Sequence, residues 1–168
     1  MVLTVKKWFV IASTLVATIS AGQALAAGNL IKVTLWDKSD NAMKKPGNGK
    51  SMGMGEMGPD MSMALMGVTL STDTVAAGEV TFEVENTSKD MEHEMVVSLV
   101  KDTNKPLPTK NGNNQVNEKA FGSLGEVAEL KPGKAGKLKV KLTPGRYILY
   151  CNVEGHYKRG MWTLLTVK

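Results

Sequence analysis

Residues 78–100 have the sequence GEVTFEVENTSKDMEHEMVVSLV, and the pattern of this stretch decides the fold class. Apolar and polar side chains alternate over residues 80–85, which is the period of a strand with one buried face. The polar residues 86–90 then end this strand, and the apolar run 95–100 indicates a second one. The stretch therefore predicts two strands joined by a short polar loop.

The same strand signals occur on both sides of this stretch. Alternation marks residues 30–36, and turn residues such as Pro144 and Gly145 separate further short apolar segments. No helical period is sustained over about ten residues, although one helical turn is expected near residues 116–122. About seven or eight short strands at regular spacing predict an antiparallel β-sandwich. The further strands are expected at residues 68–70, 74–75, 126–130, 137–142, 147–151 and 161–167.

The N-terminal residues 1–26 have the pattern of a secretory signal peptide. Two lysines form its positive end, an apolar stretch follows over residues 8–19, and Ala24-Leu25-Ala26 matches the small-x-small pattern that precedes cleavage. An uncleaved membrane anchor is the less favoured alternative, because the apolar stretch is too short to span a bilayer comfortably. We therefore expect cleavage after Ala26 and a protein that is periplasmic or otherwise exported. The mature chain, residues 27–168, is expected to be one domain without a membrane span.

The composition excludes several classes of protein. The chain has 168 residues, with 21 Lys+Arg against 16 Asp+Glu, one cysteine, two histidines and eleven methionines. One cysteine cannot form an internal disulfide, and two histidines are too few for enzymes whose centres need several imidazoles. No basic cluster is interleaved with aromatic residues, so nucleic-acid binding is not expected. We expect a single-domain monomer that is not an enzyme. The lone thiol of an exported protein is expected either to be buried and inert or to be occupied at its sulfur, with a metal as the first candidate.

Residue types that bind soft metals gather near the C-terminus, in the stretch YCNVEGHYKRGM of residues 150–161. Cys151, His156 and Met161 have the spacing C-x4-H-x4-M, and His93 stands at the start of another predicted strand. A thiolate and two imidazoles bind copper strongly, and a weak axial thioether completes an electron-transfer site, whereas zinc gains little from the thioether. Each of the four residues alone fits a packing or surface role, but together they predict one copper site.

Three segments carry a family resemblance: GRYILYC at 145–151, GHYKRGMW at 155–162 and VTFEVENTSKDMEHEMVV at 80–97. They resemble the cupredoxins, small proteins with a type 1 copper site, and the C-x4-H-x4-M spacing is similar to that of the rusticyanin and sulfocyanin type. The resemblance implies a Greek-key β-sandwich and one-electron transfer through Cu(II)/Cu(I) cycling. It also implies that the copper ligands are His93, Cys151, His156 and Met161.

One departure from the family pattern lies beside the first ligand. Many cupredoxins have Asn directly after the upstream His, whereas this chain has Glu94 there and has Asn152 after Cys151. The backbone N–H of residue 94 is still expected to reach the sulfur of Cys151. The Glu94 carboxylate is expected to favour the oxidised metal, which predicts a lowered or pH-dependent reduction potential.

Residues from about 37 to 66 form a segment rich in Gly, Lys, Asn and Met, which we expect to be a flexible insertion. Its methionines are spaced as M-x-M and M-x-x-M, and soft thioethers select Cu(I) over harder ions. The alternatives are a flexible Gly/Met linker, or a few methionines that pack against one end of the sandwich. Additional Cu(I) ligands are predicted at Met52, Met54, Met57, Met61, Met63 and Met66.

Together these features predict a periplasmic type 1 copper protein that passes single electrons, with a redox partner such as a cytochrome or a terminal oxidoreductase. The alternative is a copper-handling or copper-tolerance protein, which binds copper ions in the Met-rich segment as well as at the type 1 site. The two functions differ in the number of copper ions that one chain binds. An electron carrier needs one copper per chain, whereas a copper-handling protein binds more than one Cu(I).

Overall fold

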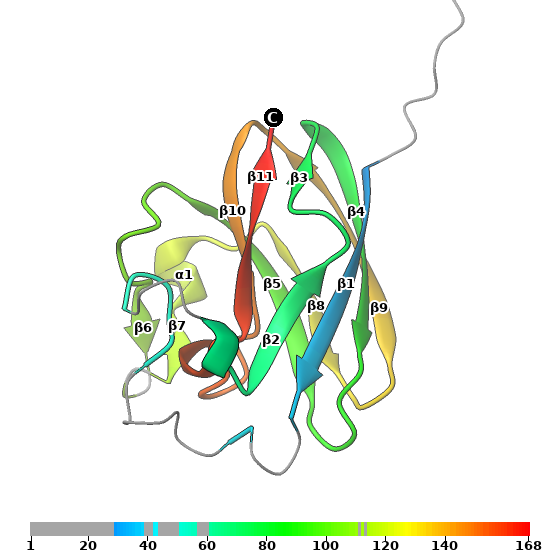
Figure 1. The fold of residues 1–168 in the computed structure, drawn as a ribbon. Coiled ribbons are helices and arrows are strands. Elements are labelled where there is room, and N and C mark those ends of the chain that lie inside the picture. Colours follow the sequence, from blue (N-terminus) through cyan, green and yellow to red (C-terminus); the bar gives the residue numbers. More distant parts are fainter. Residues whose placement is uncertain (1–28, 39–41, 44–50, 57–60, 111, 113) are drawn as a thin grey trace, which may run out of the picture.

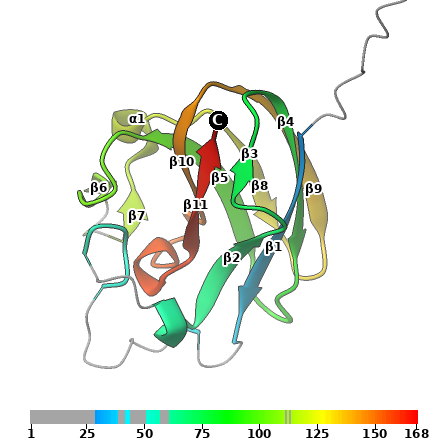
Figure 2. The same cartoon turned by 45° about the horizontal axis from the view of Figure 1, so that its top comes forward.

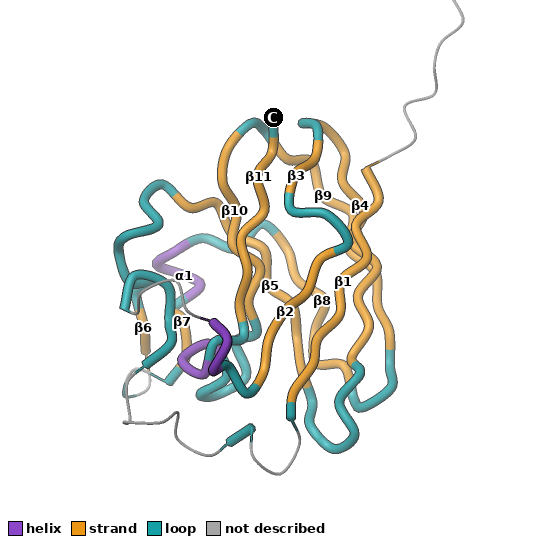
Figure 3. The backbone as a smooth tube through the Cα atoms, viewed as in Figure 1, coloured by secondary structure: helices purple, strands orange, loops and turns teal. Residues whose placement is uncertain are grey.

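The strands of the chain form a sandwich of two sheets (Figures 1 and 3). The expected signal peptide and Met57 lie outside the part of the chain that the structure describes, as does the side chain of Met61. Among the described residues, no helix has the length and apolar character needed to cross a membrane. The structure, a computed structural model, describes residues 29–38, 42–43, 51–56, 61–110, 112 and 114–168.

The two sheets contain four and five strands. The first has the order β2-β1-β4-β9, with strands at Met66–Leu70, Asn29–Asp37, Gly78–Asn86 and Ala135–Leu142. The second has the order β3-β11-β10-β5-β8, with strands at Thr74–Val75, Trp162–Val167, Gly145–Tyr150, His93–Val100 and Gly125–Leu130. Smaller elements are a hairpin of β6 and β7 (Thr109–Lys110 and Gln115–Val116), helix α1 (Glu118–Phe121) and 3-10 turns at Met61–Met63 and Tyr157–Arg159.

The predicted β-sandwich is confirmed, and its sheets are mixed rather than wholly antiparallel. Strand β1 pairs in parallel with β4, and β3 pairs in parallel with β11. The parallel pairs arise because the chain changes sheets early: only residues 71–73 separate β2 of the first sheet from β3 of the second. The two sheets together contain nine strands rather than the expected seven or eight, because residues 68–70 and 74–75 belong to separate strands, β2 and β3, in different sheets.

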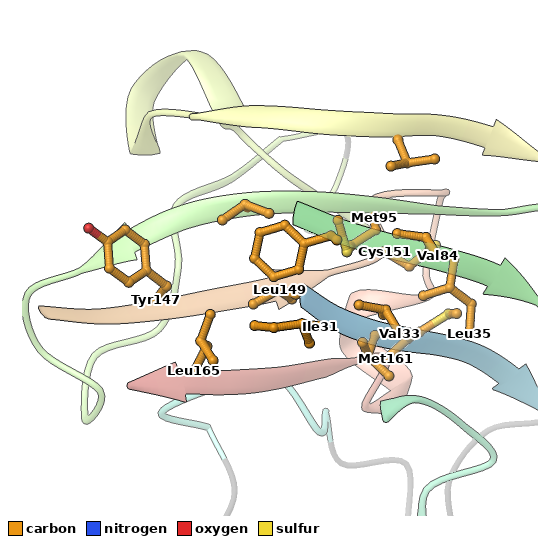
Figure 4. Close-up of a cluster of buried hydrophobic side chains, with 14 of the residues drawn as sticks. Ile31, Val33, Leu35, Val84, Met95, Tyr147, Leu149, Cys151, Met161 and Leu165 are labelled. Atoms are coloured by element: carbon orange, nitrogen blue, oxygen red, sulfur yellow. The ribbon is translucent and has the colours of Figure 1, made fainter. Parts of the chain in front are cut away.

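The main hydrophobic core lies between the two sheets (Figure 4). Strand β1 contributes Ile31, Val33 and Leu35, which alternate with more exposed residues as the sequence pattern predicts. Cys151 and Met161 belong to the same buried cluster and lie at one end of it. The core therefore holds the thiol and the thioether of the C-terminal motif away from bulk water.

A second hydrophobic cluster covers the outer face of the five-stranded sheet. Val96 of β5, and Ile148 and Tyr150 of β10, point to this face and contact Met54 and Tyr157 in the cluster. Strands β5 and β10 are thus buried on both faces. This two-sided burial explains why their sequences are continuously apolar rather than alternating. The cluster also fixes the loop that follows β10, which carries the candidate metal ligands.

Candidate metal centre

The loop of residues 151–161 connects β10 to β11 and folds back on itself. Its ends are joined by a hydrogen bond from the Cys151 backbone N–H to the Met161 carbonyl, at 3.0 Å. Within the loop, the backbone N–H of Met161 donates to the His156 carbonyl at 3.2 Å. Gly155 and Gly160 adopt positive φ values of 81° and 92°, which side chains with a Cβ rarely adopt. The loop thereby folds Cys151, His156 and Met161 towards one end of the sandwich.

His93 reaches the same end from the other side, as the first residue of β5. The preceding loop is shaped by Asn86, whose side-chain amide donates to the carbonyls of Met91 and Leu130 at 2.9 and 2.7 Å. A β-bulge between His93 and Met95 interrupts the pairing of β5 with β8. Bulges redirect side chains at functional sites, and here the bulge lies at the residue that turns its imidazole towards the C-terminal loop.

The ligating atoms of His93, Cys151 and His156 all lie within 4.8 Å of one another. The Nδ1 atoms of the two histidines are 3.2 Å apart, and the Cys151 Sγ is 3.4 Å from the His156 Nδ1. The three side chains are buried, with 0%, 0% and 3% exposure for His93, Cys151 and His156. Three of the four ligands predicted from the sequence therefore form one compact group.

Met161 is fully buried at the same end of the core as Cys151 (Figure 4). Its backbone is hydrogen-bonded to both Cys151 and His156. Axial coordination by Met161 remains a prediction from the sequence.

The electrostatic environment keeps the three donors uncharged at neutral pH. Burial raises the pKa of the Cys151 thiol to about 12, although hydrogen bonds from the backbone N–H groups of Glu94 and Val153 act in the opposite direction. Burial lowers the pKa of His156 to about 4, and neighbouring His93 and Arg159 add to this effect. Burial also lowers the pKa of His93. Two neutral imidazoles and one thiol, which must lose a proton to bind, suit a soft or borderline metal ion.

The backbone N–H of Glu94 donates to the Cys151 Sγ at 3.4 Å, which confirms the contact expected from the sequence. The Glu94 side chain has a pKa raised to about 7, because it is buried and lies near the carboxylates of Glu118 and Glu126. A hydrogen bond from the Asn152 backbone counteracts this shift. The Glu94 carboxylate, which the sequence analysis expects to be charged beside the copper ligands, is therefore only partly ionised near pH 7.

Asn152 fastens the ligand loop to the neighbouring hairpin. Its Oδ1 accepts a hydrogen bond from the Val116 N–H at 2.6 Å, and its Nδ2 donates to the Val116 carbonyl at 3.0 Å. The same Nδ2 donates to the Glu118 carboxylate at 2.6 Å. The residue after Cys151 thus ties the loop to β7 and α1, and it is itself buried.

Replacing Asn152 by alanine is expected to destabilise the metal-free protein by roughly 2–4 kcal/mol, because it removes three hydrogen bonds and leaves buried polar groups of Val116 without these partners. Chemical denaturation followed by circular dichroism measures this loss. Asn114→Ala is the matched control: it removes one exposed hydrogen bond to Glu154 and is expected to change stability by less than about 0.5 kcal/mol. Equal stabilities for the two variants would show that Asn152 does not fasten the loop.

Asp37 is a residue of this centre that the sequence did not reveal. Its Oδ2 lies 2.8 Å from the His93 Nε2, and neither side chain has any exposed surface. The sequence pattern ended the first strand at Trp36 and assigned Asp37 to the insertion, whereas β1 includes it. The available signal was its position: a carboxylate at the end of a strand whose preceding residues alternate into the core.

Four of the predicted Cu(I) ligands in the Met-rich segment have described side chains, and three of these four are buried. Met52 and Met54 are 1% and 2% exposed, Met66 is fully buried, and Met63 is 56% exposed. Residues 51–56 lie beside the ligand loop (Figure 2). Here the Met52 N–H donates to the Lys158 carbonyl and the Trp162 indole donates to the Met52 carbonyl, both at 2.8 Å. Met52 and Met54 thus pack against the sandwich, as the second alternative for this segment proposed.

No protein-family model and no curated protein matches the sequence. Several solved structures are similar to the fold. Rusticyanin from Thiobacillus ferrooxidans has 14% identity and a TM-score of 0.51, over 84% of this chain and 79% of that chain. A reduced rusticyanin has 16% identity and a TM-score of 0.50, over 84% and 81% of the two chains. An auracyanin from the photosynthetic bacterium Roseiflexus castenholzii has 22% identity and a TM-score of 0.44, over 60% and 87%.

At these identities the likeness to rusticyanin concerns the fold, which is the one that the resemblance of the sequence segments predicted. The donor set is a separate observation, made on this chain itself: one thiol and two imidazole nitrogens converge in a buried position. This chain therefore has the cupredoxin fold, and its His93, Cys151 and His156 form a group that can hold one copper ion.

Proposed function

We propose that this chain is a periplasmic, mononuclear type 1 copper protein that transfers single electrons between protein partners. One observation carries the proposal: a ring nitrogen from each of His93 and His156 and the Sγ of Cys151 converge within 4.8 Å in a buried site. This is the donor set of copper electron-transfer sites. When bound there, copper supplies the one-electron redox chemistry.

The protein contributes a site that is assembled before the metal binds. The ligand loop is closed by backbone hydrogen bonds, and the Glu94 N–H donates to the sulfur. Burial excludes bulk water from the three donors. A fixed, dry ligand set changes little when the charge of the bound metal changes, and a small structural change favours fast electron exchange.

His156 is the best candidate for the exit of the electron, because it is the only one of the three donors with any exposed surface, at 3%. The partner is proposed to be a redox protein such as a cytochrome or a terminal oxidoreductase. The chain is proposed to be a monomer and not an enzyme. It has two histidines, both in this group, so no imidazole remains for a second copper centre.

Electron exchange tests this function. The copper-loaded, oxidised protein is mixed with a reduced c-type cytochrome in a stopped-flow instrument. We expect one electron to be accepted per copper, and no reaction from the metal-free protein or from Cys151→Ser. A copper-loaded protein that accepts no electrons from the cytochrome and from small inorganic reductants alike would contradict the proposal.

A second candidate function, copper handling or tolerance, is supported by the exposed thioethers of the insertion. Met43 is 46% exposed, and the Arg159 guanidinium of the ligand loop donates to the Met43 carbonyl at 3.1 Å. Met63 is more exposed still. Exposed thioethers near a copper site are suited to capture Cu(I).

Cu(I) stoichiometry separates the two functions, and point variants are preferable to a deletion because Met52, Met54 and Met66 are part of the packed structure. The variant carries leucine at Met43, Met57, Met61 and Met63. The copper-handling function predicts more than one Cu(I) per chain, with the excess lost in this variant and kept in the control Met54→Leu. One Cu(I) per chain in all three proteins would leave electron transfer as the function.

A further inference from the structure

We infer that Asp37 is a positioning residue for the copper ligand His93. Its carboxylate fixes the imidazole in the tautomer that directs Nδ1 at the metal, and its buried negative charge favours the oxidised metal. The inference rests on the proposed copper-binding function, because it assigns a role towards that same site.

The Asp37 carboxylate is buried and hydrogen-bonded, unlike most aspartates, which lie at the protein surface. Asp37 is the last residue of β1, and its backbone is in register with Met66 of β2. The Oδ2 lies 2.8 Å from the His93 Nε2, and both side chains are completely shielded from solvent. Hydrogen bonds to ionised groups in such surroundings are among the strongest that proteins form.

The direction of this hydrogen bond decides the state of the ring. An ionised Asp37 carboxylate can only accept, which assigns the ring proton of His93 to Nε2. A neutral imidazole carries one ring proton, and its Nδ1 then presents a lone pair. That Nδ1 faces the His156 Nδ1 at 3.2 Å, inside the donor group. Without Asp37, the ring has no such constraint, and the tautomer with a proton on Nδ1 cannot bind a metal through that atom.

The charge of Asp37 acts on the metal through the ring. Solvent screens a charge poorly at a buried site, so the carboxylate stabilises a doubly charged ion more than a singly charged one. Carboxylate–histidine–metal arrangements orient the ligand and increase its basicity, and loss of the outer residue typically costs 10–100-fold in metal affinity.

Two variants separate position from charge. In Asp37→Asn, the amide oxygen can still accept from the His93 Nε2–H, so Cu(I) affinity is expected to stay within about threefold of the unmodified protein. The ratio of Cu(II) to Cu(I) affinity is expected to fall about tenfold, which corresponds to a reduction potential about 59 mV higher. In Asp37→Ala, both affinities are expected to fall by roughly 10–100-fold.

A readout without metal accompanies these measurements. Nitrogen-15 NMR of the metal-free protein reports which ring nitrogen of His93 is protonated. We expect the proton on Nε2 in the unmodified protein and in Asp37→Asn, and a mixture of tautomers in Asp37→Ala. Circular dichroism checks that each variant folds. If Asp37→Ala does not fold, the reduction potential of Asp37→Asn alone tests the inference.

The inference is overturned if Asp37→Asn leaves the affinity ratio unchanged, or if a folded Asp37→Ala keeps both the His93 tautomer and the copper affinities. Failure of the proposed function has a different signature, because the unmodified protein would then show no thiolate–copper absorption. If the unmodified protein shows normal absorption but the Asp37 variants change neither the copper affinities nor the His93 tautomer, only the role of Asp37 is contradicted.

Discussion

Replacing Cys151 by serine is expected to lower the Cu(I) affinity by on the order of a thousandfold, about 4 kcal/mol. The thiolate is the soft anionic ligand of the site, and a serine hydroxyl stays protonated at accessible pH and binds Cu(I) poorly. Competition with a chromophoric Cu(I) chelator at fixed pH measures the change. The fold should survive, because the hydroxyl can still accept from the Glu94 N–H, which reaches the sulfur at 3.4 Å.

Met161→Leu is the matched comparison for Cys151→Ser. Met161 is as deeply buried, and leucine is close to it in volume. A weak axial thioether contributes little affinity, so a loss of less than about tenfold is expected. If Cys151→Ser bound Cu(I) as tightly as the unmodified protein, the metal would have to be held elsewhere, with the Met-rich segment as the first place to look. Large losses in both variants would make Met161 a strong ligand.

The copper affinity is expected to depend steeply on pH, with a slope set by one proton. The Cys151 thiol has a pKa of about 12 in the metal-free protein, so binding displaces its proton at every pH below that value. His156 has a pKa of about 4 and is already neutral. The affinity should therefore rise about tenfold per pH unit from pH 7 to pH 10, roughly a thousandfold over this range. At lower pH, protonation of His93 and His156 makes the dependence steeper.

Competition titrations over this range, corrected for the titration of the competing chelator, measure the slope. An exposed thiol with its ordinary pKa would give a plateau above about pH 9, so continued increase to pH 10 reports the burial of Cys151. Glu94→Gln is the control, because the raised pKa of Glu94 places a second titrating group beside the ligands. A slope near two around pH 7 would contradict the neutral state assigned to the imidazoles.

The sandwich and the ligands could be predicted from the sequence because their signals are local. Alternation in β1 and β4 reports one buried face, and the C-x4-H-x4-M motif places its three residues within a single loop. The short helical turn was also found, since α1 occupies residues 118–121. No local motif identifies His93 as a ligand. It was predicted because a thiol, a thioether and one imidazole need a second imidazole to complete a copper donor set.

The contacts that support the site could not be predicted, because they join segments far apart in the chain. Asp37 meets His93 across 56 residues. Met54 joins Tyr157 in the cluster on the outer face of β5 and β10, and the Met52 carbonyl accepts a hydrogen bond from Trp162 of β11. The continuously apolar sequences of β5 and β10 indicate that both faces are covered, but no local pattern identifies the covering segment.

The central claim is that Cys151 and the two histidines form one type 1 copper site, and visible spectroscopy of the copper-loaded protein tests it most directly. Cu(II) is added stepwise to the purified metal-free protein and to Cys151→Ser. The claim predicts an intense thiolate-to-copper band, blue or green, that saturates at one equivalent and is absent from Cys151→Ser. A protein that stays colourless with Cu(II) in excess would contradict it.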